Sequence, residues 1–214
     1  MLGRADRVVA IELDTALAGK LRERFQEETR LEVVAADVLK TDLAQWGPAV
    51  VAGNLPYYIT SPVIQRVLRF GSLWARAVFL VQKEVALRLA AMPGSRDYGY
   101  LTVLTRLFAE PEYLFNVPPN SFQPAPKVDS AVVRLTPGPA RPDVEGIARF
   151  AGLCFRQKRK TLRNNLRSFV DAGILADLPE GGLRAEQITV EQFENLYARL
   201  KPYFLGSIPE SGGM

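Results

Sequence analysis

The sequence predicts an α/β fold with a mainly parallel sheet, followed by a small all-helical segment. Up to about residue 92, short apolar runs alternate with stretches whose apolar residues recur at helical spacing. That alternation is typical of strands joined by helices. Residues 136–142 contain three prolines, so neither a strand nor a helix continues through them, and they predict a linker. Beyond the linker only helical spacing remains.

Each element of the first half follows from a local pattern. Strands are predicted at Val8–Ile11, Leu31–Ala35, Ala49–Gly53 and Ala77–Val81. Helices are predicted from Thr15 to about Glu28, around Val63–Phe70, and after the fourth strand through Leu89. Strands and helices in this order favour a parallel sheet with covered faces.

The second half is less regular. Residues 102–117 are expected to include a strand whose start the pattern does not fix, and residues 128–135 alternate like a strand. Helices are predicted at Val144–Phe155, Lys158–Ala172 and Val190–Leu200. We therefore expect an α/β domain at residues 1–137, a helical domain at 143–205 and a flexible tail at 206–214.

Composition excludes several kinds of chemistry. The 214 residues include no histidine and a single cysteine, Cys154. Ser-His-Asp and Cys-His catalysis are therefore excluded, a zinc site is not expected, and no intramolecular disulfide can form. One cysteine fits a reducing cytoplasm, and no apolar run predicts a membrane span. Any chemistry must depend on carboxylates or on a reactive cofactor.

The segment Asn54-Leu55-Pro56-Tyr57 stands where the third predicted strand ends. Ligands of open α/β sheets bind beyond the carboxyl ends of the strands. Asn54 and the Leu55 carbonyl offer two acceptors on a turn that Pro56 stiffens, and Tyr57 offers a flat ring. This set suits a planar base with an exocyclic amine, because two acceptors make the amine nitrogen more pyramidal and more nucleophilic. A plain proline turn with a packed tyrosine is the alternative.

Two acids follow neighbouring predicted strands. Glu12 ends the first strand, and Asp37 comes shortly after the second. An acid at such a position often binds a nucleoside ribose, and a second acid can accept from an adenine amine. Solvated strand-end residues are the alternative.

Phe122 lies in a proline-stiffened loop, Phe122–Lys127. A second aromatic facing Tyr57 would sandwich a flipped base, which enzymes use to reach an exocyclic atom. The alternative is that Phe122 caps the core.

The positive charge is concentrated in one segment. Residues 127–170 hold ten Lys and Arg against three Asp and Glu, although the whole chain has a net charge of only +4. On the predicted helix, Arg156, Lys160, Arg163 and Arg167 fall on one side, with no acid between residues 146 and 170. Solvated helix faces usually mix signs, so we favour phosphate binding over a solvated face.

Together these residues resemble the KsgA-type ribosomal RNA adenine dimethyltransferases. The matching segments are Val9–Asp14, Gly53–Tyr57, Val81–Val85, Phe122–Val133, Arg159–Asn164 and Arg184–Ile188. The match runs from about Arg7 to Lys201 in family order.

The resemblance implies a Rossmann-like methyltransferase sheet and a helical RNA-binding domain. It implies transfer of two methyls from S-adenosyl-L-methionine to N6 of each of two adjacent adenines near the 3′ end of small-subunit ribosomal RNA. The expected partner is this RNA or the pre-30S particle, bound by a cytoplasmic monomer without metal or membrane.

The resemblance also implies a role for each site residue. Asn54, Leu55, Pro56, Tyr57 and Phe122 would be catalytic. The cofactor would contact Glu12, Leu13, Asp37, Val38 and Asn54. The RNA would contact Arg156, Lys158, Arg159, Lys160, Arg163 and Arg167.

Two departures from the family pattern lead to further expectations. Tyr58 stands where the family has Asn, which would alter loop packing. The family's first strand and Gly-rich loop would precede Arg7, so we expect an incomplete sheet and weak binding of S-adenosylmethionine by the chain as given. The alternative functions are a large-subunit methyltransferase of the erythromycin-resistance type, a DNA adenine methyltransferase, and a non-catalytic rRNA-binding assembly protein.

Overall fold

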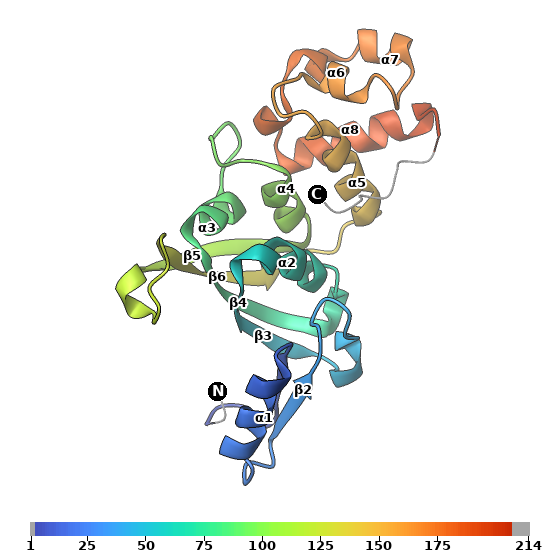
Figure 1. Ribbon diagram of the computed structural model, residues 1–214. Coiled ribbons are helices and arrows are strands. Elements are labelled where there is room, and N and C mark those ends of the chain that lie inside the picture. The colour runs from blue at the N-terminus through green and yellow to red at the C-terminus, as the bar shows by residue number, and fades with distance from the viewer. Residues whose placement is uncertain (1–2, 207–214) are drawn as a thin grey trace. The chain divides into compact units, whose positions relative to one another are not determined.

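The computed structural model describes residues 3–206 and divides into two compact units (Figure 1). The N-terminal unit extends to Pro48, and the main unit begins at Ala49. The predicted flexible tail lies outside the described residues except for Gly206.

The N-terminal unit is a single strand–helix–strand (βαβ) motif. Strand β1 (Val8–Glu12) pairs in parallel with β2 (Leu31–Ala35), and helix α1 (Thr15–Arg24) connects them. Asp14 begins the helix because its carboxylate accepts from the amides of Ala16 and Leu17. Arg22 fastens the helix to the sheet by donating to the Val33 carbonyl at 2.7 Å. Both predicted strands are confirmed, and the helix ends earlier than the predicted Glu28.

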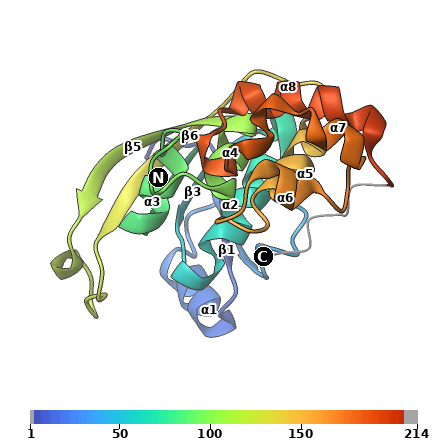
Figure 2. The same ribbon diagram turned by 90° about the horizontal axis from the view of Figure 1, so that it is seen from above.

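The main unit contains a four-stranded mixed sheet in the order β3-β4-β6-β5. Its strands are β3 (Ala49–Asn54), β4 (Trp74–Gln82), β5 (Ala109–Val117) and β6 (Ser130–Pro137). The pairing of β3 with β4 is parallel, whereas β6 is antiparallel to both β4 and β5. The hairpin of β5 and β6 extends past α3 and ends in the loop that contains Phe122 (Figure 2).

Three helices cover one face of this sheet: α2 (Thr60–Leu68), α3 (Lys83–Ala90) and α4 (Tyr100–Phe108) (Figure 1). Alternate residues of β4, including Ala77, Phe79 and Val81, are fully buried beneath them. The segment 102–117, expected to include a strand, contains a helix as well. It begins within α4 and passes directly into β5 at Ala109.

In the part of the C-terminal segment that the structure describes there are four α-helices: α5 (Val144–Cys154), α6 (Leu162–Leu166), α7 (Ala172–Ala176) and α8 (Val190–Leu200). Short 3-10 helices lie at Pro179–Gly182, Ala185–Gln187 and Lys201–Tyr203. The predicted helix at Lys158–Ala172 is wrong, because within that range only residues 162–166 and the last residue, Ala172, which begins α7, are α-helical. Thr161 starts that short helix by accepting from the Asn164 amide, and residues 156–160 form a loop before it. Within residues 3–206 we find no helix long and apolar enough to cross a membrane.

One hydrophobic core runs through the sheet helices and the C-terminal helices. Helix α4 packs against α5, and the buried Tyr98 donates its hydroxyl to the Ile188 carbonyl at 2.8 Å. The proline-rich linker therefore redirects the chain without interrupting the core.

Candidate active site and basic cavity

The turn after β3 holds two acceptors that no other group occupies. Asn54 is the last residue of β3 and is exposed, and the Leu55 amide donates to the Leu80 carbonyl at 3.2 Å. The Pro56 carbonyl accepts from the Ile59 amide and from the Thr60 hydroxyl, both at 3.1 Å. Within residues 3–206, no hydrogen bond uses the Asn54 side chain or the Leu55 carbonyl. The turn is thus rigid, and its acceptors are available.

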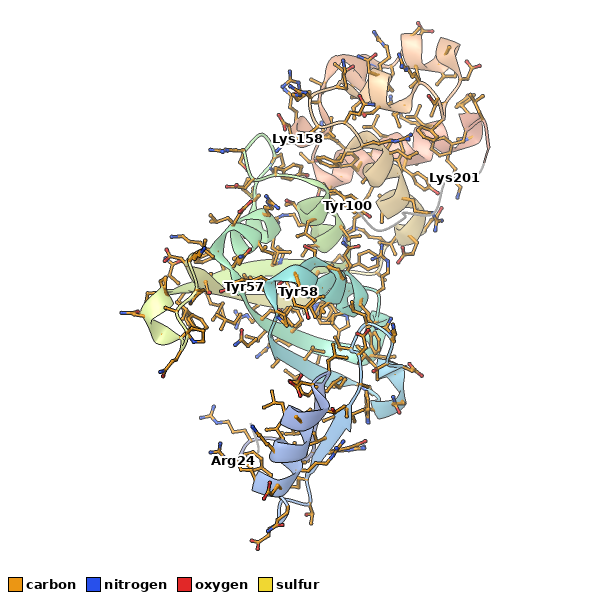
Figure 3. The ribbon with its side chains drawn as sticks, in the orientation of Figure 1. Arg24, Tyr57, Tyr58, Tyr100, Lys158 and Lys201 are labelled. Carbon is orange, nitrogen blue, oxygen red and sulfur yellow. The ribbon has the colours of Figure 1, made fainter. Side chains whose placement is uncertain are left out.

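Tyr57 begins a short 3-10 helix (Tyr57–Ile59) immediately after this turn. Its hydroxyl lies 2.9 Å from the Ser130 hydroxyl on β6, and 37% of the residue is exposed. The neighbouring Tyr58 is 79% exposed (Figure 3). Tyr57 is therefore anchored at the end of its ring, with part of its surface open to a ligand.

Phe122 is half-buried on the loop between β5 and β6. Its amide donates to the Pro119 carbonyl at 3.1 Å. The peptide bond between Gln123 and Pro124, in the same loop, is cis. Within the described chain no ring contact joins Phe122 to Tyr57. The sandwich of a base between these two rings therefore remains a prediction.

In the N-terminal unit, Glu12 and Asp37 stand at the same end of two adjacent parallel strands. Glu12 pairs with Ala35 in the register of β1 and β2, and Asp37 follows two residues later. Glu12 accepts from the Asp14 amide at 3.0 Å with one carboxylate oxygen, and Asp37 accepts from the Leu39 amide at 2.8 Å. Each carboxylate accepts from one amide, and the second oxygen of Asp37 also lies 3.9 Å from the exposed Lys40 ammonium. Both carboxylates keep capacity for a ligand, which fits the hydroxyls and amine of a nucleoside.

Next to these acids, Leu13 is 62% exposed and Val38 is half-buried. An exposed leucine beside a fixed carboxylate offers apolar surface to the flat face of a base.

A basic cavity of about 330 Å³ lies in the C-terminal helical segment. It is lined by Arg156, Gln157, Lys160, Asn164, Asn165, Arg167, Ser168 and Phe169. The Arg156 guanidinium is held over the Phe169 ring at 5.6 Å from its centroid. The cavity combines three cations with amide and hydroxyl donors, and it has no acidic side chain in its lining. Such a set is suited to phosphate oxygens.

Asn165 is one of the residues that line this cavity. It is 6% exposed, and its side chain accepts from the Gln157 amide at 3.0 Å. It also donates to the Gln157 carbonyl at 3.2 Å and to the Lys160 carbonyl at 3.4 Å. These three bonds fix the loop that carries two of the cations.

The structure corrects the placement of Arg163 in the predicted cationic stripe. Its guanidinium donates to the carbonyls of Leu175 and Ala176 at 3.0 and 3.1 Å, at the end of α7. Arg163 therefore stabilises a helix terminus, and it does not line the basic cavity. Arg156, Lys160 and Arg167 come together there without sharing one helix.

Of the other two predicted RNA contacts, Arg159 is exposed, and Lys158 makes contacts within the protein. The Lys158 ammonium donates to the Arg96 carbonyl at 3.2 Å and lies 3.9 Å from the Glu186 carboxylate (Figure 3). Ser130 and Asn165 were not singled out by the sequence analysis. The available signal for Ser130 was its position as a polar residue at the start of an apolar strand, and for Asn165 it was the pair of adjacent asparagines.

Comparisons with known proteins give consistent results. Residues 1–201 match the family model described as ribosomal RNA adenine dimethylase. Ribosomal RNA small subunit methyltransferase A of Acidobacterium capsulatum is 43% identical over 94% of this chain and 76% of its own length. The protein with that description from Legionella pneumophila (strain Corby) is 41% identical, over 92% and 79%.

Two solved structures are similar over nearly the whole chain. A dimethyladenosine transferase from Plasmodium falciparum has a TM-score of 0.80 and 26% identity, covering 96% of this chain and 86% of its own. The 23S rRNA methyltransferase ErmE has a TM-score of 0.69 and 29% identity, covering 94% and 84%. The fold is therefore the Rossmann-like methyltransferase fold with a C-terminal helical region.

Proposed function

Because the chain belongs to the ribosomal RNA adenine dimethylase family, we propose that it dimethylates N6 of two adjacent adenines in small-subunit ribosomal RNA. The substrate that we propose is a hairpin loop near the 3′ end of that RNA, which contains the two adenines. The observation that carries the proposal is the pair of free acceptors, the Asn54 amide oxygen and the Leu55 carbonyl, on a turn fixed at both ends.

The two acceptors act on the target amine. The lone pair of the adenine N6 amine is delocalised into the ring, which makes the nitrogen a poor nucleophile. Hydrogen bonds from N6 to Asn54 and Leu55 hold its hydrogens out of the ring plane and orient the lone pair. Because Pro56 and its two hydrogen bonds fix the turn, this orientation costs little reorganisation.

Tyr57 and Phe122 stack on the target base. Ring stacking contributes about 1–3 kcal/mol per base and tolerates any base, so the preference for a base with an exocyclic amine comes from the two acceptors. Removing the base from its stack is the usual requirement for chemistry on an exocyclic atom.

S-adenosylmethionine supplies a methyl group on a sulfonium, which is reactive without acid or base catalysis by the protein. In the N-terminal unit, Glu12 would bind the ribose hydroxyls and Asp37 the adenine amine, with Leu13 and Val38 beside the adenine. These two acceptors fit the cofactor because a backbone amide holds each carboxylate at the same end of the strand pair.

The basic cavity, together with the exposed Arg159, would bind phosphates of the RNA. We propose that the protein acts as a monomer in the cytoplasm on the small-subunit RNA or the pre-30S particle. The similarity to ErmE leaves one competing substrate, the large-subunit RNA. Methyl transfer to hairpins copied from each RNA distinguishes the two substrates.

The test is Asn54→Ala in the full chain, with Asn195→Ala as the matched control on the exposed side of α8. We expect methyl transfer to fall about 10²–10³-fold in Asn54→Ala, by analogy with the loss of one preorganised hydrogen-bonding group, with RNA affinity unchanged. Asn195→Ala should retain full activity. Near-normal turnover by Asn54→Ala would remove this residue from the mechanism, and RNA binding without any turnover in the wild-type chain would favour an assembly protein.

A further inference from the structure

We infer that Ser130 is a positioning residue that sets the orientation of the Tyr57 ring for the target adenine. This inference rests on the proposed function, because it assigns Tyr57 to the target base. Ser130 belongs to β6, far from Tyr57 in the sequence, and the structure joins the two hydroxyls at 2.9 Å.

The position of Ser130 in the sheet makes it a fixed anchor. It is the first residue of β6 and pairs with Gln82 of β4 on one side and Val117 of β5 on the other. Ser130 is 0% exposed, and within residues 3–206 its hydroxyl has Tyr57 as its sole hydrogen-bond partner. A buried hydroxyl held between two strands moves very little, so a group bonded to it is also held.

Ser130 lies on the same face of the sheet as Asn54. Asn54 is in register with Leu80, and Leu80 is in register with Val132. Ser130 is two residues from Val132, so its side chain points to the same face. The Tyr57 side chain therefore extends from the turn after Asn54, across the end of β4, to an anchor on β6.

This anchor supplies what the local backbone of Tyr57 lacks. The 3-10 helix that Tyr57 begins is only three residues long and has no side-chain cap. The turn hydrogen bonds fix the Tyr57 backbone, but the ring can still rotate about its side-chain torsions. A hydrogen bond at the far end of the ring removes that freedom, while the 37% of the residue that is exposed remains available for stacking.

Loss of the anchor should affect the chemical step more than binding. A Phe ring or an unanchored Tyr ring stacks on adenine about as well, but the base is no longer held at one angle to the Asn54 acceptor. The loss of one neutral hydrogen bond corresponds to a change of roughly two- to tenfold. We expect that change in kcat for methyl transfer, with KM for the RNA nearly constant.

The experiment is a double-mutant cycle of Ser130→Ala and Tyr57→Phe in the full chain. The binding probe is a hairpin RNA with two adjacent adenines in its loop, one of them replaced by 2-aminopurine, whose emission depends on the angle and overlap at which the ring stacks and needs no cofactor. Methyl transfer is measured on the unlabelled hairpin. Ser130→Thr keeps the hydroxyl, and Ser95→Ala is the matched control because it removes a buried hydroxyl that has no partner within the described chain.

Each single variant should lower kcat about two- to tenfold and alter the 2-aminopurine emission of the complex, and the double variant should be no worse than either one. Ser130→Thr should restore both signals, and Ser95→Ala should change neither. Additive losses, or a lower melting temperature with unchanged kcat and emission, would overturn the inference and leave the proposed function intact. If Tyr57→Ala also leaves kcat and emission unchanged, the stacking role in the proposed function is wrong and the inference falls with it.

Discussion

Gly146 in the first turn of α5 should not tolerate even one additional methyl group. A Cβ at this position would stand 2.1 Å from the Tyr197 hydroxyl and 2.6 Å from a carboxylate oxygen of Asp143. The Tyr197 hydroxyl and the Lys201 ammonium each donate to the other carboxylate oxygen of Asp143, Oδ2, at 2.6 Å. The substitution Gly146→Ala must therefore displace a ring from α8 and break its hydrogen bond.

The net effect follows from three contributions to the free energy of unfolding. Overpacking costs about 1–3 kcal/mol. The lost hydrogen bond costs about 0.5–1.5 kcal/mol. Alanine in place of glycine inside a helix returns about 0.5–1 kcal/mol. We expect Gly146→Ala to be less stable than wild type by roughly 0.5–4 kcal/mol, which lowers the melting temperature by about 2–4 °C for each kcal/mol.

The assay is thermal and urea unfolding of the full chain, with Gly152→Ala as the matched control in the same helix. A Cβ at Gly152 would meet the Tyr100 ring at 3.6 Å, an ordinary contact, so helix propensity should decide and stability should be equal or higher. If Gly146→Ala melts as high as Gly152→Ala, then Tyr197 does not occupy this position in solution and the packing of α8 on α5 is wrong.

Three further predictions concern charged groups. Hydrogen bonds from the Lys201 ammonium, and to a lesser extent from the Tyr197 hydroxyl, hold the pKa of Asp143 below its usual range. The ionised carboxylate therefore stabilises the fold above pH ~4, and this stabilisation is lost as the pH falls through the lowered pKa. Because the Asp143 side chain is 40% exposed, Asp143→Asn should cost only about 0.5–1 kcal/mol near pH 7, and urea unfolding should show the difference vanishing in acid. Replacing Arg156, Lys160 and Arg167 of the basic cavity with alanine should weaken binding of hairpin RNA. Each lost phosphate contact should lower the slope of the logarithm of the binding constant against the logarithm of the salt concentration by about 0.7–0.9. An unchanged slope would mean that the cavity does not contact RNA. Glu12→Gln should weaken S-adenosylmethionine binding about tenfold in calorimetry, whereas Glu32→Gln, on the neighbouring strand and paired with Arg7, should not.

Local patterns predicted the elements that carry the proposed active site. Strand β3 was expected at Ala49–Gly53 and ends at Asn54. The first two strands were expected at their observed positions, which places Glu12 and Asp37 at one end of a parallel pair. These predictions succeeded because β-branched runs and a proline turn act locally. The anchor of Tyr57 on Ser130 could not be predicted, because register across β4 determines it.

The basic segment shows the opposite case. Residues 158–172 are rich in Lys, Arg and Leu, which favour a helix, and the sequence therefore predicted one. Tertiary contacts prevail instead, because the Asn165 amide binds the loop backbone and Arg163 caps α7. The concentration of positive charge is read directly from the sequence, whereas the arrangement of Arg156, Lys160 and Arg167 around the cavity differs from the predicted helical stripe.

The buried amide of Asn165 has a consequence for the thermodynamics of RNA binding. Because its three hydrogen bonds already order residues 157–160, a polyanion that enters the basic cavity does not have to freeze a mobile loop. Little configurational entropy is lost and little apolar surface is buried, so the heat capacity change should be small, unlike that of basic tails that fold when they bind. Affinity at this cavity should therefore vary steeply with salt concentration but only weakly with temperature.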